Sequence, residues 1–226
     1  MEKEIGYMTS LIGDPVRTTI LWTLLDGRAY TATELAICAD TSPQNISMHL
    51  NKLVQADLLT VASQGRHKYY RFSREEVAYA IEAIGNLIPG EKHKKIINNK
   101  DNSAIKYCRT CYDHLAGKVG VLITEGLVKQ KILERTDSDY LLTKRGDIFF
   151  GELKIDTYKL KMHRRAFAKP CLDWSERKHH LAGSLGAAFL DTMLSLDWLR
   201  RAKQSRVVIV TSKGQQQLYD RLRVTV

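Results

Sequence analysis

Two short helices expected between residues 33 and 55 limit the possible folds of this chain more than any other feature. The first is expected at 33–40 and the second at 43–55, with only the tight turn Asp40-Thr41-Ser42 between them. Ser42-Pro43 is typical of a helix start, because serine caps free N–H groups and proline suits the first helical position. Apolar residues then recur at helical spacing along the second segment. This arrangement predicts a helix-turn-helix.

A β-hairpin is expected directly after the second helix. Leu58–Ala62 and Lys68–Phe72 have the composition of strands, and Gly65 suits the turn between them. A further helix is expected to run to Ile88, where Pro89-Gly90 would end it. The order helix, turn, helix and hairpin predicts a winged helix-turn-helix domain over residues 1–90.

The second helix of this motif would enter the major groove of DNA, where its first residues and its outward side chains reach base edges. Glutamine and asparagine can form paired hydrogen bonds with adenine, and methionine or serine can contact the thymine methyl group. Basic side chains of the hairpin would face phosphates. The residues expected to contact DNA are Thr33, Ser42, Gln44, Asn45, Ser47, Met48, His49, Lys52, Arg66, His67 and Lys68.

The charge of the chain is compatible with a nucleic-acid partner but is unevenly distributed. The formal net charge is +10, yet residues 1–90 carry eight basic and ten acidic side chains, so the excess lies in the second half. Hydrophobic residues make up 44% and charged residues 27%, which is typical of a globular protein. No apolar run is long enough to span a membrane, and no secretory signal is recognised. Four cysteines are too few for a disulfide scaffold, so a cytoplasmic protein is expected.

Four phrases of the first half occur together in one known family. They are Leu11-Ile12-Gly13-Asp14-Pro15-Val16-Arg17, Glu34-Leu35-Ala36, the segment Ser42–Leu53, and Gly65-Arg66-His67-Lys68-Tyr69-Tyr70. Through them, residues 8–88 resemble the arsenic-repressor (ArsR-type) winged helix-turn-helix regulators. The resemblance implies a homodimer that binds a palindromic operator in double-stranded DNA and represses until an inducer binds. Metal-sensing members carry Cys-x-Cys in the first helix of the motif, whereas this chain has only Cys38, which we interpret as a small core residue.

A homodimer is also expected on geometric grounds. One recognition helix covers few base pairs, and a two-fold dimer would place two such helices about one DNA turn apart. The expected interface combines Met8, Leu11 and Ile12 with the helix at 74–88.

The second half, residues 107–226, follows an expected linker at 91–106 and contains a weak internal repeat. His114-Leu115-Ala116-Gly117 recurs as His180-Leu181-Ala182-Gly183, and each copy is expected to open an apolar helix. Later in each copy, Thr143 and Thr211 are followed three residues on by glycine, as expected for a capped helix. The repeat predicts a C-terminal domain of two degenerate half-winged-helix units, in a chain that is mainly α with short β-hairpins, an α+β fold. Through the phrases Arg109–Gly117 and Pro170–Arg177, this half resembles the C-terminal extension of a longer ArsR-type subgroup.

Cysteine, histidine and acidic side chains gather near both copies of the repeat. Cysteines and histidines from two segments could bind Zn²⁺ or another metal ion tetrahedrally. A small anionic or thiol-reactive effector could instead bind at the two helix starts. In a third interpretation the cysteines only pack in the core and the histidines cap helices. The candidate effector or metal residues are Cys111, Asp113, His114, Cys171, Asp173 and His180; Cys108 forms a Cys-x-x-Cys with Cys111.

The sequence therefore predicts a sequence-specific DNA-binding transcriptional regulator rather than an enzyme. We expect a repressor that an unknown small effector, sensed by the second half, releases from DNA. One alternative is a zinc- or thiol-dependent enzyme tethered to DNA, but only Cys111 with His114 offers a nucleophile and a base, and no cofactor motif accompanies them. The other alternative is a structural protein that binds DNA non-specifically through its basic second half.

Overall fold

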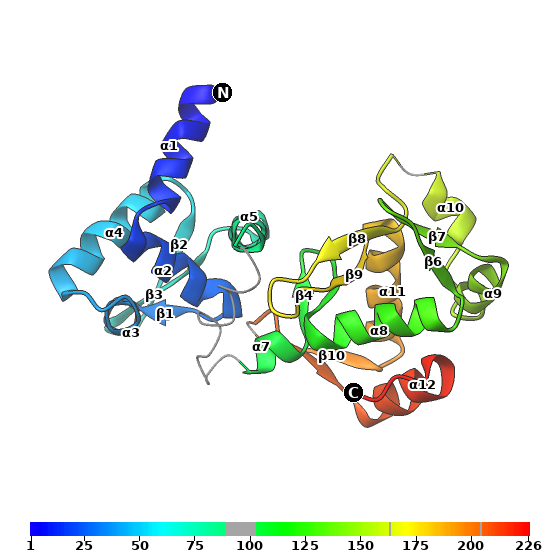
Figure 1. The fold of residues 1–226 in the computed structure, drawn as a ribbon. Coiled ribbons are helices and arrows are strands. Elements are labelled where there is room, and N and C mark those ends of the chain that lie inside the picture. The colour runs from blue at the N-terminus through cyan, green and yellow to red at the C-terminus, as the bar shows by residue number, and fades with distance from the viewer. Residues whose placement is uncertain (89–102, 163, 204) are drawn as a thin grey trace. The chain divides into compact units, whose positions relative to one another are not determined.

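The structure is a computed structural model that describes residues 1–88, 103–162, 164–203 and 205–226. It divides into two compact units, Met1–Gly85 and Asn86–Val226 (Figure 1). Both units combine helices with short antiparallel strand pairs, so the expected α+β class is confirmed. Most of the expected linker at 91–106 lies outside the described residues, and its last residues belong to helix α7, Ser103–Tyr107.

The N-terminal unit contains a winged helix-turn-helix. Its three-stranded antiparallel sheet has the order β1-β3-β2. The elements are α1 (Glu2–Ile12), α2 (Pro15–Thr23), the short 3₁₀ helix η1 (Leu24–Asp26), β1 (Tyr30–Thr31), α3 (Ala32–Cys38), α4 (Pro43–Gln55), β2 (Leu59–Gln64), β3 (His67–Phe72) and α5 (Glu75–Asn86).

Side-chain caps fix where the helices of this unit begin. Asp14 accepts a hydrogen bond from the backbone N–H of Arg17 and starts α2. Thr31 and Glu34 form a reciprocal capping box at the start of α3. Ser42 caps α4 as expected, with Pro43 at its first position. The capped helices pack around a core that includes Ile20 and Leu50, both fully buried.

The C-terminal unit contains the same order of elements twice after α7. Each copy has a strand pair, a helix, a second strand pair and a second helix. The first copy comprises β4 (Arg109–Cys111), β5 (His114–Ala116), α8 (Gly117–Lys129), β6 (Leu133–Arg135), β7 (Tyr140–Leu142) and α9 (Lys144–Glu152). After α10 (Thr157–Lys161), the second copy comprises β8 (Lys169–Leu172), β9 (His179–Ala182), α11 (Gly183–Ser195), β10 (Leu199–Arg201), β11 (Val208–Val210) and α12 (Ser212–Leu222).

The structure corrects the expected starts of the two apolar helices. The His-Leu-Ala triplets at 114–116 and 180–182 lie in β5 and β9, and the helices begin only at Gly117 and Gly183. These two glycines have φ values of 78° and 86°, in the left-handed region that a side chain disfavours. His114 and His180 are therefore strand residues and not helix caps. The interpretation of each copy as half of a winged helix stays a prediction.

One apolar cluster runs through the whole C-terminal unit. It joins residues of both copies, among them Val119, Leu127, Leu185 and Leu190, and it includes Trp198. Thr143 and Thr211 cap α9 and α12 by accepting hydrogen bonds from the N–H groups of the glycines three residues later. Among the described residues, no helix is both long enough and apolar enough to cross a membrane.

Candidate functional site

Helix α4 buries one face and exposes the other. Ile46, Leu50 and Leu53 are at most 1% exposed. The opposite face places the side chains of Gln44, Ser47, Met48 and Lys52 in solvent, and Thr33 of α3 is exposed as well. These five side chains belong to the expected DNA-contacting set, and their amide, hydroxyl, thioether and ammonium groups are available to base edges and phosphates.

Two of the expected DNA-contacting residues shape the turn before α4. The hydroxyl of Ser42 accepts a hydrogen bond from the N–H of Asn45 at 3.2 Å. The side-chain amide of Asn45 donates to the hydroxyl of Thr41 at 2.7 Å and is half-buried. The exposed amide nearest the start of the helix therefore belongs to Gln44.

His49 is not on the exposed face, and its expected place there is wrong. The side chain is only 6% exposed. Its Nδ1 lies 3.4 Å from a carboxylate oxygen of Asp14 and 3.4 Å from Nη1 of Arg17. His49 follows Ile46 by three residues and precedes Leu53 by four, so helical spacing already placed it on the buried face. This histidine stabilises the packing of α4 on α2.

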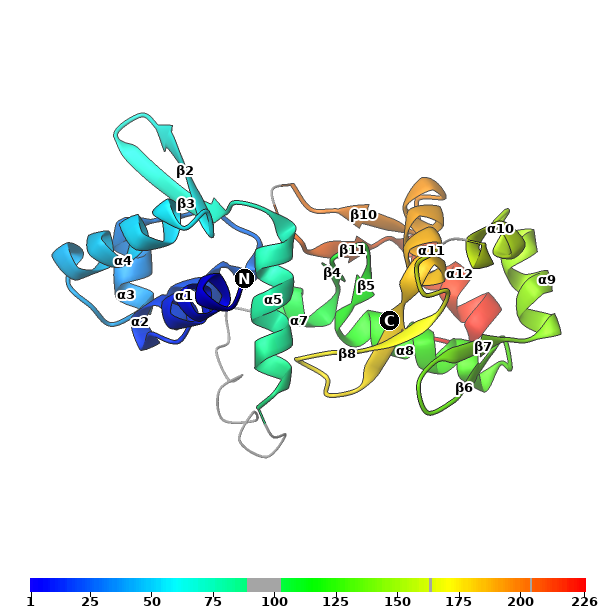
Figure 2. The same cartoon turned by 90° about the horizontal axis from the view of Figure 1, so that it is seen from above.

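The wing is the β2–β3 hairpin, which Figure 2 shows projecting beyond the helices of its unit. The strands pair in register from Leu59 opposite Phe72 to Gln64 opposite His67. Gly65, with φ of 60°, allows the tight turn. Arg66, His67 and Lys68 are all exposed at this tip. The hairpin can therefore present basic groups to phosphates.

The four cysteines occupy three different environments. Cys38 is exposed, so the expectation of a buried core residue is wrong. Cys108 is fully buried, and burial raises the pKa of its thiol to about 12. Cys111 and Cys171, in contrast, lie together with two histidines. Cys108, unlike Cys111, is therefore not part of the group with the histidines.

The cluster of Cys111, His114, Cys171 and His180, which we call the Cys–His cluster, is built by two hairpins. Cys111 lies opposite His114 in the β4–β5 pair, and Cys171 lies opposite His180 in the β8–β9 pair. One potential ligand atom of each side chain lies within 4.8 Å of those of the other three. Cys111, His114 and His180 are buried, and Cys171 is partly buried. Alternation along β9 directs the neighbouring His179 elsewhere, toward Arg135.

The two histidines face each other across the cluster. Their Nε2 atoms are 3.2 Å apart. On the outer side, Nδ1 of His114 lies 3.3 Å from the carboxylate of Asp113. Nδ1 of His180 likewise lies 3.3 Å from the carboxylate of Asp173. All six residues expected from the sequence to contact an effector or a metal are therefore brought together.

Each outer carboxylate is paired with an arginine. Arg165 forms an ion pair with Asp113 at the partly exposed edge. Fully buried Arg109 donates to Asp173 at 3.0 Å. Burial alone would raise the pKa of Asp173, but the charge of Arg109, the nearby imidazole of His180 and a hydrogen bond from Ser175 hold it well below its usual range. Asp173 is therefore a carboxylate inside the protein.

Three N–H groups at the starts of α8 and α11 already have acceptors. Gly117 donates its N–H to the carboxylate of Asp173 at 2.7 Å. Ser184 and Leu185 donate theirs to the carbonyls of Ala166 and Phe167. An anionic effector at these helix starts would have to displace these acceptors.

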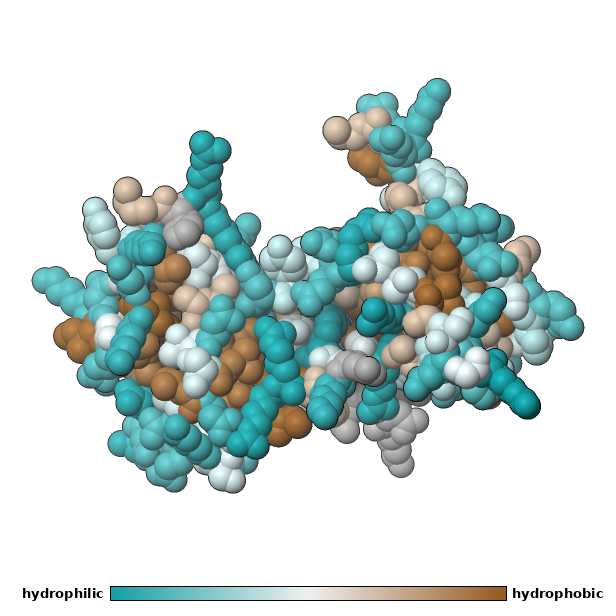
Figure 3. Space-filling view, turned by 180° about the vertical axis from the view of Figure 1, so that it is seen from behind, coloured by the Kyte–Doolittle hydropathy of each residue, from teal (hydrophilic) through white to brown (hydrophobic). Residues whose placement is uncertain are grey.

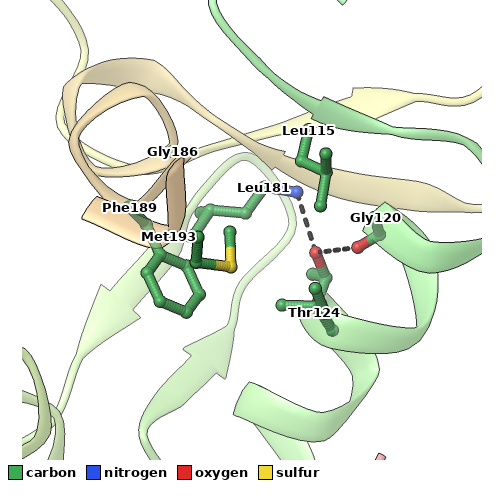
Figure 4. A pocket seen from close by; sticks show the side chains of 8 residues that line it. Leu115, Gly120, Thr124, Leu181, Gly186, Phe189 and Met193 are labelled. Atoms are coloured by element: carbon green, nitrogen blue, oxygen red, sulfur yellow. Dashed lines mark hydrogen bonds between the residues drawn. The ribbon is translucent and has the colours of Figure 1, made fainter. Parts of the chain in front are cut away.

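A narrow apolar cavity lies between α8 and α11 (Figure 4). Equivalent residues of the two copies line it: Leu115 with Leu181, and Gly120 with Gly186. Thr124 closes one side by accepting a hydrogen bond from the N–H of Leu181 and donating one to the carbonyl of Gly120. At about 10 Å³ the cavity has room for about one water molecule, so an organic effector does not fit it in this conformation.

The sequence analysis missed Arg109 and Arg165 and a longer form of the repeat. Cys111-Tyr112-Asp113 and Cys171-Leu172-Asp173 are two copies of Cys-x-Asp, each followed by the His-Leu-Ala-Gly step. Aligning the copies on cysteine as well as on histidine would have paired each histidine with its carboxylate.

Comparison with known proteins gives one family match and one relative along nearly the whole chain. A family described as a helix-turn-helix domain matches residues 12–62. An uncharacterized HTH-type transcriptional regulator of Bacillus subtilis (strain 168), YdfF, is 43% identical over 214 residues, which cover 95% of each chain.

Several solved structures also align with part of the chain, including the following two. The homodimeric winged helix-turn-helix domain of Mb0332 from Mycobacterium bovis, a possible ArsR-family regulator, is 20% identical over 38% of this chain and 78% of that one, with a TM-score of 0.35. The antimony-specific transcriptional repressor AntR is 23% identical over 42% of this chain and 83% of that one, with a TM-score of 0.37. At these low TM-scores we infer nothing further from either structure.

Proposed function

This chain belongs to the HTH-type transcriptional regulators, and from that premise we propose that it is a sequence-specific repressor that an effector releases from its operator. As a transcriptional regulator it is not an enzyme, so a catalyst tethered to DNA is not considered further. The observation that carries the proposal is the exposed polar face of α4, which lies beside a basic wing. We propose that it acts on double-stranded DNA in the cytoplasm.

Within this proposal, α4 reads bases and the wing holds phosphates. Gln44 carries an exposed amide at the start of α4, where recognition helices reach base edges. Lys68 and Arg66 are exposed on the wing, where their basic side chains are proposed to contact phosphates. Thr33, Ser42, Asn45, Ser47, Met48, Lys52 and His67 complete the proposed contact set, from which buried His49 is removed.

The separate roles of α4 and the wing can be tested by measuring the DNA affinity of three variants. Each is measured on genomic fragments selected by binding to the parent chain and on random DNA. Gln44→Ala should change base preference and cost about 1–3 kcal/mol on the best site only. Lys68→Ala should weaken all sequences alike and lower the salt slope by about one. Gln55→Ala, at the exposed far end of the same helix, is the matched control and should change neither. Equal losses on both DNAs for Gln44→Ala would refute the assignment of α4.

We also propose that two copies of the chain bind a palindromic operator. Leu11, expected at the interface, is buried in its own unit at 4% exposure and is removed from it. The exposed apolar side chains of α1 are instead Ile5 and Tyr7, at 57% and 53%, and Ile84 of α5 is 44% exposed. Figures 1 and 3 show α1 extending away from the rest of its unit, so these side chains are accessible.

Light scattering at micromolar concentration should give a dimer for the parent chain. Tyr7→Asp should shift it toward monomer, because a charge would be buried in the apolar interface. Glu4→Lys on the same helix also alters charge but removes no apolar contact, and it should stay dimeric. A monomeric parent chain, with or without operator DNA, would rule out this interface.

The effector is proposed to act through the C-terminal unit. Support comes from the six side chains Cys111, Asp113, His114, Cys171, Asp173 and His180. They form a polar group, four of whose members are buried and two partly buried, that the DNA-binding role does not use. Footprinting separates a sequence-specific regulator from the non-specific structural alternative. Protection of one short palindrome is expected, whereas uniform protection along the DNA would favour the structural protein. Loss of reporter expression when the gene is present, and not its gain, is expected for a repressor.

A further inference from the structure

The Cys–His cluster has the composition and spacing of a metal site. We propose that Cys111, His114, Cys171 and His180 bind one tetrahedral divalent transition-metal ion of the Zn²⁺ class. Two thiolate sulfurs with two imidazole nitrogens in tetrahedral geometry select Zn²⁺ among common ions. The proposal concerns the C-terminal unit alone and stands whether or not the chain is a repressor.

The distances agree with a shared ion. Zn–N bonds of 2.0–2.1 Å at the tetrahedral angle place two nitrogens about 3.3 Å apart, and Zn–S bonds of 2.3 Å place two sulfurs about 3.8 Å apart. The two Nε2 atoms are 3.2 Å apart, and every pair of ligand atoms is within 4.8 Å. An ion between the four atoms therefore needs only small side-chain adjustments.

The outer carboxylates prepare both histidines to bind metal through Nε2. Asp113 lies 3.3 Å from Nδ1 of His114 and can accept its Nδ1–H, which leaves the Nε2 lone pair directed inward. Nδ1 of His180 lies 3.3 Å from the carboxylate of Asp173 but is buried without a hydrogen-bond partner among the described residues, so a small turn of this ring would let it donate to Asp173. This carboxylate–histidine–metal arrangement is typical of metal sites. Without a cation, one Nε2 has to carry a proton and donate it to the other across 3.2 Å. The neutral donor histidine then presents its Nδ1 lone pair to a carboxylate, which is unfavourable. A cation between the two Nε2 atoms removes this conflict, because both histidines can then carry the proton on Nδ1.

The bound site is electrically neutral. Cys111 and Cys171 each lose a thiol proton to solvent when the ion binds, so two thiolates balance the two charges of the metal. The outer carboxylates are balanced separately, Asp173 by Arg109 and Asp113 by Arg165. A neutral site can be buried without the large penalty of an unpaired charge.

Four protein ligands leave no open coordination position, so the ion is structural rather than catalytic. The ligands come from the β4–β5 and β8–β9 hairpins, which belong to different copies of the repeat. The ion therefore joins the two copies at their first strand pairs. Its binding free energy adds to the stability of the C-terminal unit.

Elemental analysis of the full-length protein, purified without chelators under reducing conditions, gives the first test. We expect about one zinc per chain. Replacement by Co²⁺ should give the visible absorption of tetrahedral cobalt and the near-ultraviolet band of thiolate-to-cobalt charge transfer. The double variant Cys38→Ser/Cys108→Ala keeps only the two proposed cysteine ligands and should retain the full charge-transfer band.

Cys111→Ser and Cys171→Ser should each lose most of that band and bind zinc at least 100-fold more weakly. Asp113→Asn, which removes the charge of an outer carboxylate, should weaken binding about 10–100-fold without changing the number of thiolates in the cobalt spectrum. If the Cys111 or Cys171 variant fails to fold, the Cys38→Ser/Cys108→Ala variant still shows whether Cys111 and Cys171 are the thiolate ligands. Metal-free protein with no cobalt charge-transfer band overturns the proposal, and so does a band that disappears in the double variant. If the parent chain gives the expected cobalt spectrum but binds no DNA, the proposed function is refuted while the proposed metal site stands.

Discussion

At the scale of single residues, Arg109 and Asp173 form an ion pair that is buried inside the C-terminal unit. Both side chains are at most 1% exposed. Asp173 accepts hydrogen bonds from Arg109, Ser175 and the N–H of Gly117, and Arg109 also lies over the ring of Trp174. A buried pair of this kind contributes little net stability, but removing one partner leaves an uncompensated charge inside the protein.

Asp173→Ala should therefore destabilise the C-terminal unit by about 3–5 kcal/mol. Chemical denaturation of parent and variant, both in excess chelator so that metal does not contribute, measures this difference. Glu125→Gln is the control, because Glu125 and Lys178 pair at 2.7 Å on the surface, where such a pair contributes about 0–1 kcal/mol. Equal losses for the two variants would show that burial does not set the strength of the Arg109 pair.

From the sequence, residues were placed correctly where spacing and chemistry agreed, and wrongly where the two conflicted; the roles of these residues stay predictions. The six cluster residues were identified because cysteine, histidine and aspartate recur near both copies of the repeat. His49 was misplaced because its polarity outweighed its spacing from Ile46 and Leu53. Its partners, Asp14 and Arg17, lie more than 30 residues earlier, so no local pattern reveals them.

At the scale of elements, glycines decide how closely the two apolar helices approach the strands. A Cβ at Gly186 would lie 2.5 Å from the carbonyl oxygen of Leu181 and 3.4 Å from Cβ of His114. A Cβ at Gly120 would lie 2.6 Å from the carbonyl oxygen of Leu115 and 3.7 Å from Cβ of His180. Each helix thus packs close to the histidine of the other copy, because its first turn carries a glycine there.

Gly186→Ala should destabilise the C-terminal unit by about 1–3 kcal/mol, because backbone must shift to admit the methyl group. Gly151→Ala in α9 is the matched control, since nothing lies within 4 Å of a Cβ there. That substitution should stabilise by about 0.5–1 kcal/mol through the higher helix propensity of alanine. Thermal denaturation of the two variants measures both changes in stability, the expected loss for Gly186→Ala and the expected gain for Gly151→Ala. A stable Gly186→Ala protein would mean that the α11 packing is not as close as described.

Long helices with clear capping residues were predicted from the sequence, whereas short strands were not. The range of α4 matches the expected helix, since Ser42-Pro43 and a regular apolar stripe define it. The strand pairs that carry the Cys–His cluster have strands of three or four residues, which are too short to show alternation. Their His-Leu-Ala triplets directly precede apolar helices, and no polar residue separates the two. The predicted helix starts were therefore too early. The two-residue strand β1 left no signal at all.

At the scale of the whole molecule, the two units have separate cores and separate candidate roles. The expected DNA-contacting residues lie in Met1–Gly85, and all four proposed metal ligands lie in Asn86–Val226. Each unit has its own apolar cluster of described residues. Metal binding should therefore stabilise one unit directly and leave the other unchanged.

Calorimetry of the full-length chain should accordingly show two unfolding transitions. Chelation should lower only the transition of the C-terminal unit, because an ion stabilises only the fold that holds its ligands. Ser42→Ala identifies the other transition: loss of the α4 cap costs about 1 kcal/mol, which lowers the melting temperature of a unit this size by about 4–8 °C. The two effects should be independent and additive, since they act on different cores. One transition that responds to both chelation and Ser42→Ala would instead mean that the two units unfold as a single cooperative body.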